Sequence, residues 1–221
     1  PFDFINSVFA IMSCKAAQHT YQVLTKRPER LLEYLKRFKE SGINPHWKKF
    51  SENIWLGVSV EDQATANERI PLLLQVPAVV RFLSCEPLLG PVDIEAIPTP
   101  RIESRNLKGE FALTKTGYLN WIICGGESGP GARPMHPDWA RSLREQCAAA
   151  GVPFFFKQWG EWQPLFTSKT YTGSKGLLDI KSKKYFVMPV AGGDTVFRRV
   201  GKKAAGRLLD GMEYNEFPNV K

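Results

Sequence analysis

Charged and polar residues follow five apolar runs of this sequence, at the point where each run stops. Glu86 comes after "RFLSC". Pro87 favours an extended conformation at Glu86, which can aim its carboxylate into an opening shared by the ends of these runs. Lys157 comes after "PFFF" and supplies a cation that can bind an anionic group. A carboxylate in such a place can act as a general base. The alternative for Lys157 is an amine that simply extends from apolar surface into water.

The stretch "GGESGPGARP" follows another of these runs. It has neither the spacing of a P-loop nor that of a dinucleotide-binding loop, so neither phosphate site is predicted. Gly125 and Gly126 would let the backbone approach a ligand closely. Glu127 can hydrogen-bond a hydroxyl or amino group, and Arg133 can pair with a carboxylate or phosphate. The alternative is a tight turn in which Arg133 simply satisfies Glu127.

The remaining candidates end the other apolar runs. The carboxyl ends of parallel strands meet at one edge of a sheet or barrel, so these residues are predicted to share one rim. Two structural alternatives stay open: Glu61 and Asp62 can interact with the first turn of a helix, and Lys26 and Arg27 can be plain surface cations. The additional rim candidates are Lys26, Arg27, Ser59, Glu61, Ser84, Gln158 and Trp159.

The elements that must position these residues alternate along the chain. Nearly continuous apolar runs predict parallel strands covered on both faces, and the segments between them have helical spacing. Pro71 is expected to break or kink the second helix. The pattern predicts an α/β fold. Strands are expected within 19–28, 53–62, 78–87, 119–128 and 152–162, helices within 28–42, 63–76 and 136–151, and an excursion with a hairpin around Gly109 within 88–118.

The pattern weakens after Trp162, where short strands are expected within 182–190 and 194–201 and a short helix within 201–211. We therefore divide the chain into a first domain, 1–163, and a small basic α+β appendage, 164–221. The appendage has eleven Lys or Arg against five Asp or Glu, and the whole chain has a formal charge of +8. This excess predicts attraction to nucleic acid. The alternative is a solvated basic surface.

Composition excludes several classes of protein. A chain of 221 residues that is 43% hydrophobic can bury a real core, and no apolar run approaches the roughly 18 residues of a membrane span. The start, "PFDFINSVFA", lacks the features of a signal peptide and also lacks Met, which suggests a fragment. Four scattered cysteines without zinc spacing favour a reducing cytoplasm and small buried side chains. These are Cys14, Cys85, Cys124 and Cys147.

Six blocks of the sequence, in this order, resemble a bacteriophage and prophage family of unknown function, the "gp thirty-seven / gp sixty-eight" family. The resemblance covers essentially the whole chain. The blocks are "QVLTKRPER", "NIWLGVSVED", "FLSCEPLLGPV", "WIICGGESGPGARP", "PFFFKQWGEW" and "GKKAAGRLLDGMEYNEFP".

The resemblance implies a radical S-adenosylmethionine (radical-SAM) protein. Such a protein is a partial (β/α) barrel in which a loop of three cysteines after the first strand holds an iron–sulfur cluster (4Fe–4S), and later strand ends bind S-adenosylmethionine. This chain starts after the point where that loop is expected, and Cys14 alone cannot replace three clustered thiolates. We therefore expect a partial barrel lacking its first strand, inactive by itself, with both cofactors belonging to the full-length protein.

The resemblance also implies roles for the rim residues. Glu86 and Lys157 would be catalytic, Ser84 and Glu86 would line the centre of the barrel, and Lys157 would bind an anionic substrate or the methionine carboxylate. The cofactor-binding residues would be Ser59, Glu61, Ser84, Gly125, Gly126 and Glu127, the substrate-binding residues would be Lys26, Arg27, Arg133, Gln158 and Trp159, and this chain would supply no metal ligand.

Three functions remain open from the sequence. The first is a radical enzyme whose substrate is unknown, with nucleic acid as one candidate. The second is a non-catalytic nucleic-acid-binding or accessory protein, with a partner protein encoded nearby. The third is a metal-independent enzyme that uses Glu86 or Glu127 as a base. Fold alone does not choose among them. The second function would depend on Lys181, Lys183, Lys184, Arg198, Arg199, Lys202 and Lys203.

Overall fold

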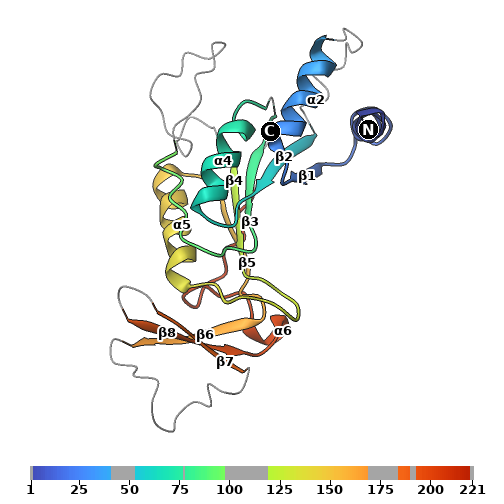
Figure 1. Cartoon of the computed structure of the whole chain (residues 1–221). Coiled ribbons are helices and arrows are strands. Elements are labelled where there is room, and N and C mark those ends of the chain that lie inside the picture. The colour runs from blue at the N-terminus through green and yellow to red at the C-terminus, as the bar shows by residue number, and fades with distance from the viewer. Residues whose placement is uncertain are drawn as a thin grey trace.

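A five-stranded parallel sheet forms the centre of the protein (Figure 1). The structure is a computed structural model that describes residues 2–40, 53–76, 78–97, 119–168, 184–189 and 193–219. The strands lie side by side in the order β1-β2-β3-β4-β5, which is also their order along the chain. The α/β class and the five parallel strands predicted from the apolar runs are thereby confirmed. The strands are β1 (Tyr21–Thr25), β2 (Ile54–Ser59), β3 (Arg81–Cys85), β4 (Trp121–Gly125) and β5 (Phe154–Gln158).

Three helices pack against one face of this sheet, where they form the main hydrophobic core. They are α2 (Pro28–Glu40), α4 (Gln63–Leu73) and α5 (Pro137–Ala150). Leu143 of α5 and Ile70 of α4 are fully buried against strand residues such as Leu83. Helix α4 continues through Pro71 and ends two residues later, so the expected break at this proline is wrong. A proline so close to the end of a helix disturbs few of its hydrogen bonds.

Two helical elements precede the first strand, in agreement with the helix expected around Cys14. Helix α1 (Phe2–Ala10) continues into a π-helical turn, η1 (Ile11–Lys15). The ring of Phe9 stacks on Tyr34 of α2 with the ring centroids 5.4 Å apart, which fixes α1 against α2. Cys14 lies in η1 and is exposed, so the prediction that each cysteine is buried is wrong at this position. The other three cysteines are buried as predicted.

The opposite face of the sheet carries an aromatic cluster: Trp55, Phe82, Trp121, Phe155 and Phe217. Trp121 is its centre, with ring centroids 4.8 to 6.0 Å from the other four rings. The last described segment of the chain holds Phe217 there, because the Trp121 indole N–H donates to the Glu216 carbonyl at 2.8 Å. The cluster occupies the amino-terminal half of this face and leaves its carboxyl end to polar residues.

A second, antiparallel sheet lies beyond the carboxyl end of the first one (Figure 1). Its strands are β6 (Trp162–Ser168), β8 (Asp194–Arg199) and β7 (Tyr185–Met188), in that spatial order, and the short helix α6 (Lys202–Ala205) follows β8. The predicted strands around 182–201 and the short helix are confirmed, whereas β6 was missed. Strand β6 tolerates Pro164 because it lies at the edge of the sheet. The division of the chain at residue 163 stays an interpretation.

Some sequence-based expectations fall on segments outside the described residues. They are the hairpin around Gly109 and the tail lysines Lys181 and Lys183. Within the part of the chain that is described, no helix is long and apolar enough to cross a membrane.

Asp62 sets the start of helix α4 at the carboxyl end of β2. Its carboxylate accepts a hydrogen bond from the Thr65 backbone N–H at 2.9 Å, and the Thr65 hydroxyl lies 3.0 Å from the Asp62 backbone N–H. The reciprocal arrangement is a capping box, which satisfies free N–H groups at the start of a helix. These bonds, chiefly the one from the Thr65 backbone, lower the pKa of Asp62. The helix-start alternative is therefore correct for Asp62.

We predict that Asp62→Ala lowers the free energy of unfolding by about 1 kcal/mol at neutral pH, because the cap is lost. The folded pKa of Asp62 is depressed, so its contribution is fully present above the unfolded value of about 3.9 and disappears as the pH falls through the folded pKa. Urea unfolding across this pH range should show the two proteins converging at low pH. Glu68→Ala on the exposed side of α4 is the control, and a gap of constant size down to the lowest pH would contradict the assignment.

Candidate functional site

Glu86 stands at the carboxyl end of β3 and contacts two residues of β5. The Lys157 ammonium lies 2.8 Å from Glu86 Oε2, and the Gln158 side-chain amide donates to Glu86 Oε1 at 2.8 Å. The Glu86–Pro87 peptide bond is cis. The side chain of Glu86 is 18% exposed and that of Lys157 is 49% exposed. The structure thus brings together the two residues predicted to be catalytic, and their ion pair remains open to water.

Gly125 and Gln158 shape the surroundings of this carboxylate. A Cβ atom on Gly125 would lie 3.2 Å from the Glu86 carboxyl group, so a larger residue there would crowd it. Gln158 is almost fully buried, and its amide also bonds the Gly126 carbonyl and the Gly160 N–H. Gln158 was predicted to bind substrate; in the structure its amide holds Glu86 in place.

Glu61, at the carboxyl end of β2, forms a second cluster with two cations. Lys26 Nζ lies 2.5 Å from Glu61 Oε1, and Arg69 Nη1 lies 2.8 Å from Oε2 and also donates to the Ser59 carbonyl. Sequence reasoning missed Arg69. The available signal was its position about two helical turns after the start of α4, on a helix that returns along the sheet from the same rim.

This second cluster has unused hydrogen-bonding capacity. Glu61 Oε1 is buried and is contacted by the Lys26 ammonium at 2.5 Å, so this acceptor is occupied. The Nε atom of Arg69 is also buried and donates no hydrogen bond within the described part of the chain. Buried polar atoms are normally satisfied, so the unused donor of Arg69 beside its ion pair with Glu61 requires an explanation.

Strand register links the two clusters. Ser59 of β2 and Ser84 of β3 are direct partners in the parallel ladder, and both are buried. Glu61 and Glu86 each lie two residues after these serines, just beyond the carboxyl ends of β2 and β3. Lys157 reaches from β5 past β4 to Glu86, so its ammonium lies near the end of β3. The serines, the two carboxylates and their cations therefore share one rim, as predicted.

Glu127 and Arg133 form a closed pair on the loop after β4. The Arg133 side chain donates two hydrogen bonds of 2.8 Å to the two carboxylate oxygens, and its backbone N–H donates a third. The Arg133 side chain is the main reason why the pKa of Glu127 is lowered. The loop therefore contains the Glu127–Arg133 pair that the tight-turn alternative predicted. Roles for Glu127 and Arg133 in binding a ligand stay predictions.

Two predicted ligand-binding residues lie away from the rim clusters. Trp159 is buried on the helix side, where its ring packs edge-on against Phe156 at 4.9 Å between centroids. Arg27 is exposed and lines an apolar groove between α1, β1 and α2. Among the described residues, neither Trp159 nor Arg27 forms a hydrogen bond or an ion pair with Glu61 or Glu86. Their assignment to substrate binding stays untested.

His136, for which no role was predicted, caps the start of helix α5. Its Nδ1 atom accepts a hydrogen bond from the Asp138 N–H, so Nε2 carries the proton and donates to the Thr195 hydroxyl at 2.7 Å. Burial lowers the pKa of His136 and keeps the ring neutral at neutral pH. The residue thereby ties α5 to strand β8 of the second sheet.

Two arginines of the basic appendage are engaged in structural contacts. Arg199 donates to the carbonyls of Gly129 and Pro130 on the loop after β4, and Arg207 lies over the ring of Phe155. Lys202 and Lys203 are exposed and have no ion pair with any described residue. The described part of the appendage therefore leaves fewer cations for a polyanion than the sequence suggests.

The described residues contain no group of three His, Cys, Asp or Glu side chains that could hold a metal ion. The three buried thiols are held in their neutral form, since burial raises the pKa of Cys85 to about 12 and also raises the pKa of Cys124 and Cys147. Iron–sulfur ligands are thiolates, so the described cysteines do not fit such a cluster.

Gly126 is required by the packing of two loops. A Cβ atom on Gly126 would lie 2.0 Å from the Trp159 carbonyl oxygen, and one on Gly160 would lie 2.0 Å from the Glu127 carbonyl oxygen. Each glycine therefore lets the loop after β4 lie directly against the loop after β5. The predicted approach of Gly126 to a cofactor is a separate role and stays a prediction.

We predict that Gly126→Ala lowers the free energy of unfolding by at least about 2 kcal/mol, because the backbone must move to relieve the overlap. Gly131→Ala is the matched control on the same loop, since nothing lies within 4 Å of its added Cβ. Urea denaturation should place the control within about 0.5 kcal/mol of the wild type. Equal stability of the two variants would show that the loop contact carries no energy.

Comparison with known proteins places the chain in a family without naming its activity. A family model described as "Protein of unknown function (DUF5131)" matches residues 1–218. No curated protein and no solved structure matches the chain. Because the match spans nearly the whole sequence, the chain belongs to this family of proteins of unknown function, DUF5131.

Proposed function

We propose that the rim formed by Glu61, Glu86 and their cations binds S-adenosylmethionine, as the cofactor-and-substrate part of a phage-related radical-SAM-like protein. The observation that carries the proposal is that the little-exposed Glu61 is held by an exposed lysine, Lys26, which a ligand can displace, while the neighbouring Arg69 Nε is buried without a hydrogen bond among the described residues. A ribose hydroxyl or an amino group of the ligand would take the place of the Lys26 ammonium at Glu61 Oε1. The carboxylate of its methionine portion would bind the Lys157 ammonium.

The ion pairs at the rim favour such an exchange of partners. Lys26 is 62% exposed and Lys157 is 49% exposed, whereas the carboxylates that they contact are 12% and 18% exposed. A water-exposed lysine–carboxylate pair contributes only about 0 to 1 kcal/mol, so redirecting the ammonium to a ligand costs little. The less exposed carboxylates remain in place as fixed acceptors. A zwitterion with hydroxyl groups complements this mixture of charges better than a simple anion does.

The order of the strands supports the barrel part of the proposal. In a (β/α) barrel, strands that follow one another in sequence are neighbours in the sheet, and ligands bind at their carboxyl ends. Strands β1 to β5 have this order, and the rim lies at the matching end. Glu86 is the proposed catalytic base and Lys157 its partner, because they meet at the end of the central strand β3.

The iron–sulfur cluster does not enter the proposal for this chain. The described thiols do not fit it, as shown above, so no step of a reaction is derived through it. An upstream loop of three cysteines in the full-length protein stays a prediction, as do a cytoplasmic location and an origin in phage. Nucleic-acid binding through the basic appendage remains the alternative function.

We predict that the isolated chain binds S-adenosylmethionine in equilibrium dialysis with radiolabelled ligand. Glu61→Gln and Lys157→Met should each weaken binding by about tenfold or more, because each removes one charged partner of a hydrogen bond. Glu95→Gln and Lys36→Met, which change exposed residues of the same types elsewhere, should leave the affinity unchanged. Thermal melting of all four variants separates loss of binding from loss of fold. Unchanged affinity in both rim variants, or no binding by the wild type, would remove the proposal.

A further inference from the structure

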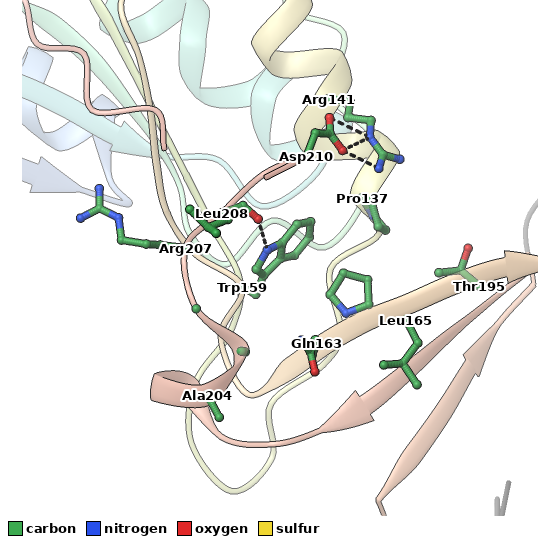
Figure 2. A pocket seen from close by; sticks show the side chains of 13 residues that line it. Pro137, Arg141, Trp159, Gln163, Leu165, Thr195, Ala204, Arg207, Leu208 and Asp210 are labelled. Carbon is green, nitrogen blue, oxygen red and sulfur yellow. Dashed lines mark hydrogen bonds and ion pairs between the residues drawn. The ribbon is translucent and has the colours of Figure 1, made fainter. Parts of the chain in front are cut away.

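A cavity of about 490 Å³ lies between the second sheet and the start of helix α5, on the helix side of the first sheet. Figure 2 shows Trp159 between strand β6 and the segment after α6, with the Arg141–Asp210 ion pair at one end. The volume falls within the usual range of about 300 to 1,000 Å³ for ligand pockets. None of the rim residues Glu61, Glu86 and Lys157 lines it. It is therefore a separate site from the one proposed above.

The walls of this cavity combine apolar and polar side chains. Trp159 is 6% exposed, and its indole N–H donates to the Leu208 carbonyl at 2.8 Å, which ties the appendage to the end of β5. Leu165 and Leu208 also line the cavity and are 38% and 51% exposed. Both leucines are partly exposed beside the cavity, so an apolar group that enters from outside can pack against them.

The surroundings of the cavity are positively charged. Ala204 and Ala205 line it, and the same helical turn carries Lys202 and Lys203, which have no ion pair with any described residue. Arg198 is also exposed and binds the side chain of Gln163, which lines the cavity. The acidic residue in the lining, Asp210, pairs with Arg141 and Arg144, which also pair with Asp138 and Glu145. The cations beside the cavity that have no ion pair with a described residue therefore include Lys202 and Lys203. Charge complementarity therefore selects an acidic partner.

We propose that this cavity is the docking site for an acidic peptide segment of a partner protein, with one large apolar side chain of that segment inserted against Leu165 and Leu208. The insertion buries the apolar surfaces of Leu165 and Leu208, and flanking carboxylates pair with Lys202 and Lys203. A nucleic acid fits less well, because base stacking requires an accessible aromatic face and Trp159 is almost completely covered. This inference does not depend on the proposed binding of S-adenosylmethionine.

The test uses fluorescein-labelled hexapeptides in which one Phe is flanked by Glu residues, and matched peptides with Ala in place of Phe. Fluorescence polarisation with the full chain should give an affinity about tenfold or more higher for the Phe peptide, because it buries one large apolar side chain. Ala204→Phe should reduce the affinity for the Phe peptide to that for the Ala peptide by filling the cavity. Ala204 is exposed, so this variant is expected to fold, and Ala149→Phe at the far end of α5 is the matched control.

A second comparison separates the apolar anchor from the charges. Replacing Lys202 and Lys203 together by Gln should weaken both peptides to a similar degree and should flatten the dependence of binding on salt. Equal binding of the Phe and Ala peptides, or absence of binding, would overturn the proposal. So would tighter binding of a labelled thymidine oligonucleotide that Ala204→Phe abolishes, which would identify the site as one for nucleic acid.

Discussion

The parallel register of strands β2 and β3 is the constraint on which the candidate site depends. It makes Ser59 and Ser84 direct neighbours, and it therefore delivers Glu61 and Glu86 to the same edge of the sheet. Two carboxylates at one partly buried edge repel each other unless cations accompany them. Lys26 and Arg69 accompany Glu61, and Lys157 accompanies Glu86. The chain draws these cations from β1, α4 and β5, so the whole sheet contributes to the charge balance.

The close approach of two loops extends this constraint to the second sheet. Gly126 and Gly160 let the loop after β4 lie against the loop after β5, and the second of these loops leads directly into β6. Arg199 of β8 then donates to two carbonyls of the first loop. The second sheet is therefore fixed relative to the rim. The cavity over Trp159 forms where the two sheets and helix α5 meet.

The sequence predicted much of this fold because nearly continuous apolar runs mark the five strands. The predicted coverage of both faces holds for β3, whose residues are all buried, but is wrong for β1 at the edge of the sheet, where Leu24 is 47% exposed. The polar residues at the ends of these runs were predicted to share one rim, and the structure places Glu86 against Lys157 there. Arg69 was missed because only residues at strand ends were considered as rim candidates, whereas its side chain reaches the rim from helix α4. Strand β6 was missed because Pro164 argues against a strand, a rule that an edge position relaxes.

Trp159 shows a different limit of sequence reasoning. It follows Gln158 at the end of β5, so its position alone assigned it to the rim, yet its ring turns to the helix side and packs on Phe156. The alternation of side chains along a strand predicts which face of the sheet each strand residue lies on, but it does not predict this for residues in the loop that follows. The tight packing of Gly126 against the Trp159 carbonyl directs this loop, and only the structure shows that contact.

The most direct test of the rim as a site for a zwitterion compares S-adenosylhomocysteine with 5′-methylthioadenosine, because both are thioethers of adenosine with an uncharged sulfur and only the first carries the amino and carboxylate groups. Isothermal titration of the isolated chain with each ligand measures what those groups contribute. Our account predicts that 5′-methylthioadenosine binds at least about tenfold more weakly, because it cannot engage the lysine and carboxylate pairs together. Equal affinity for the two ligands, or binding of neither, would contradict it.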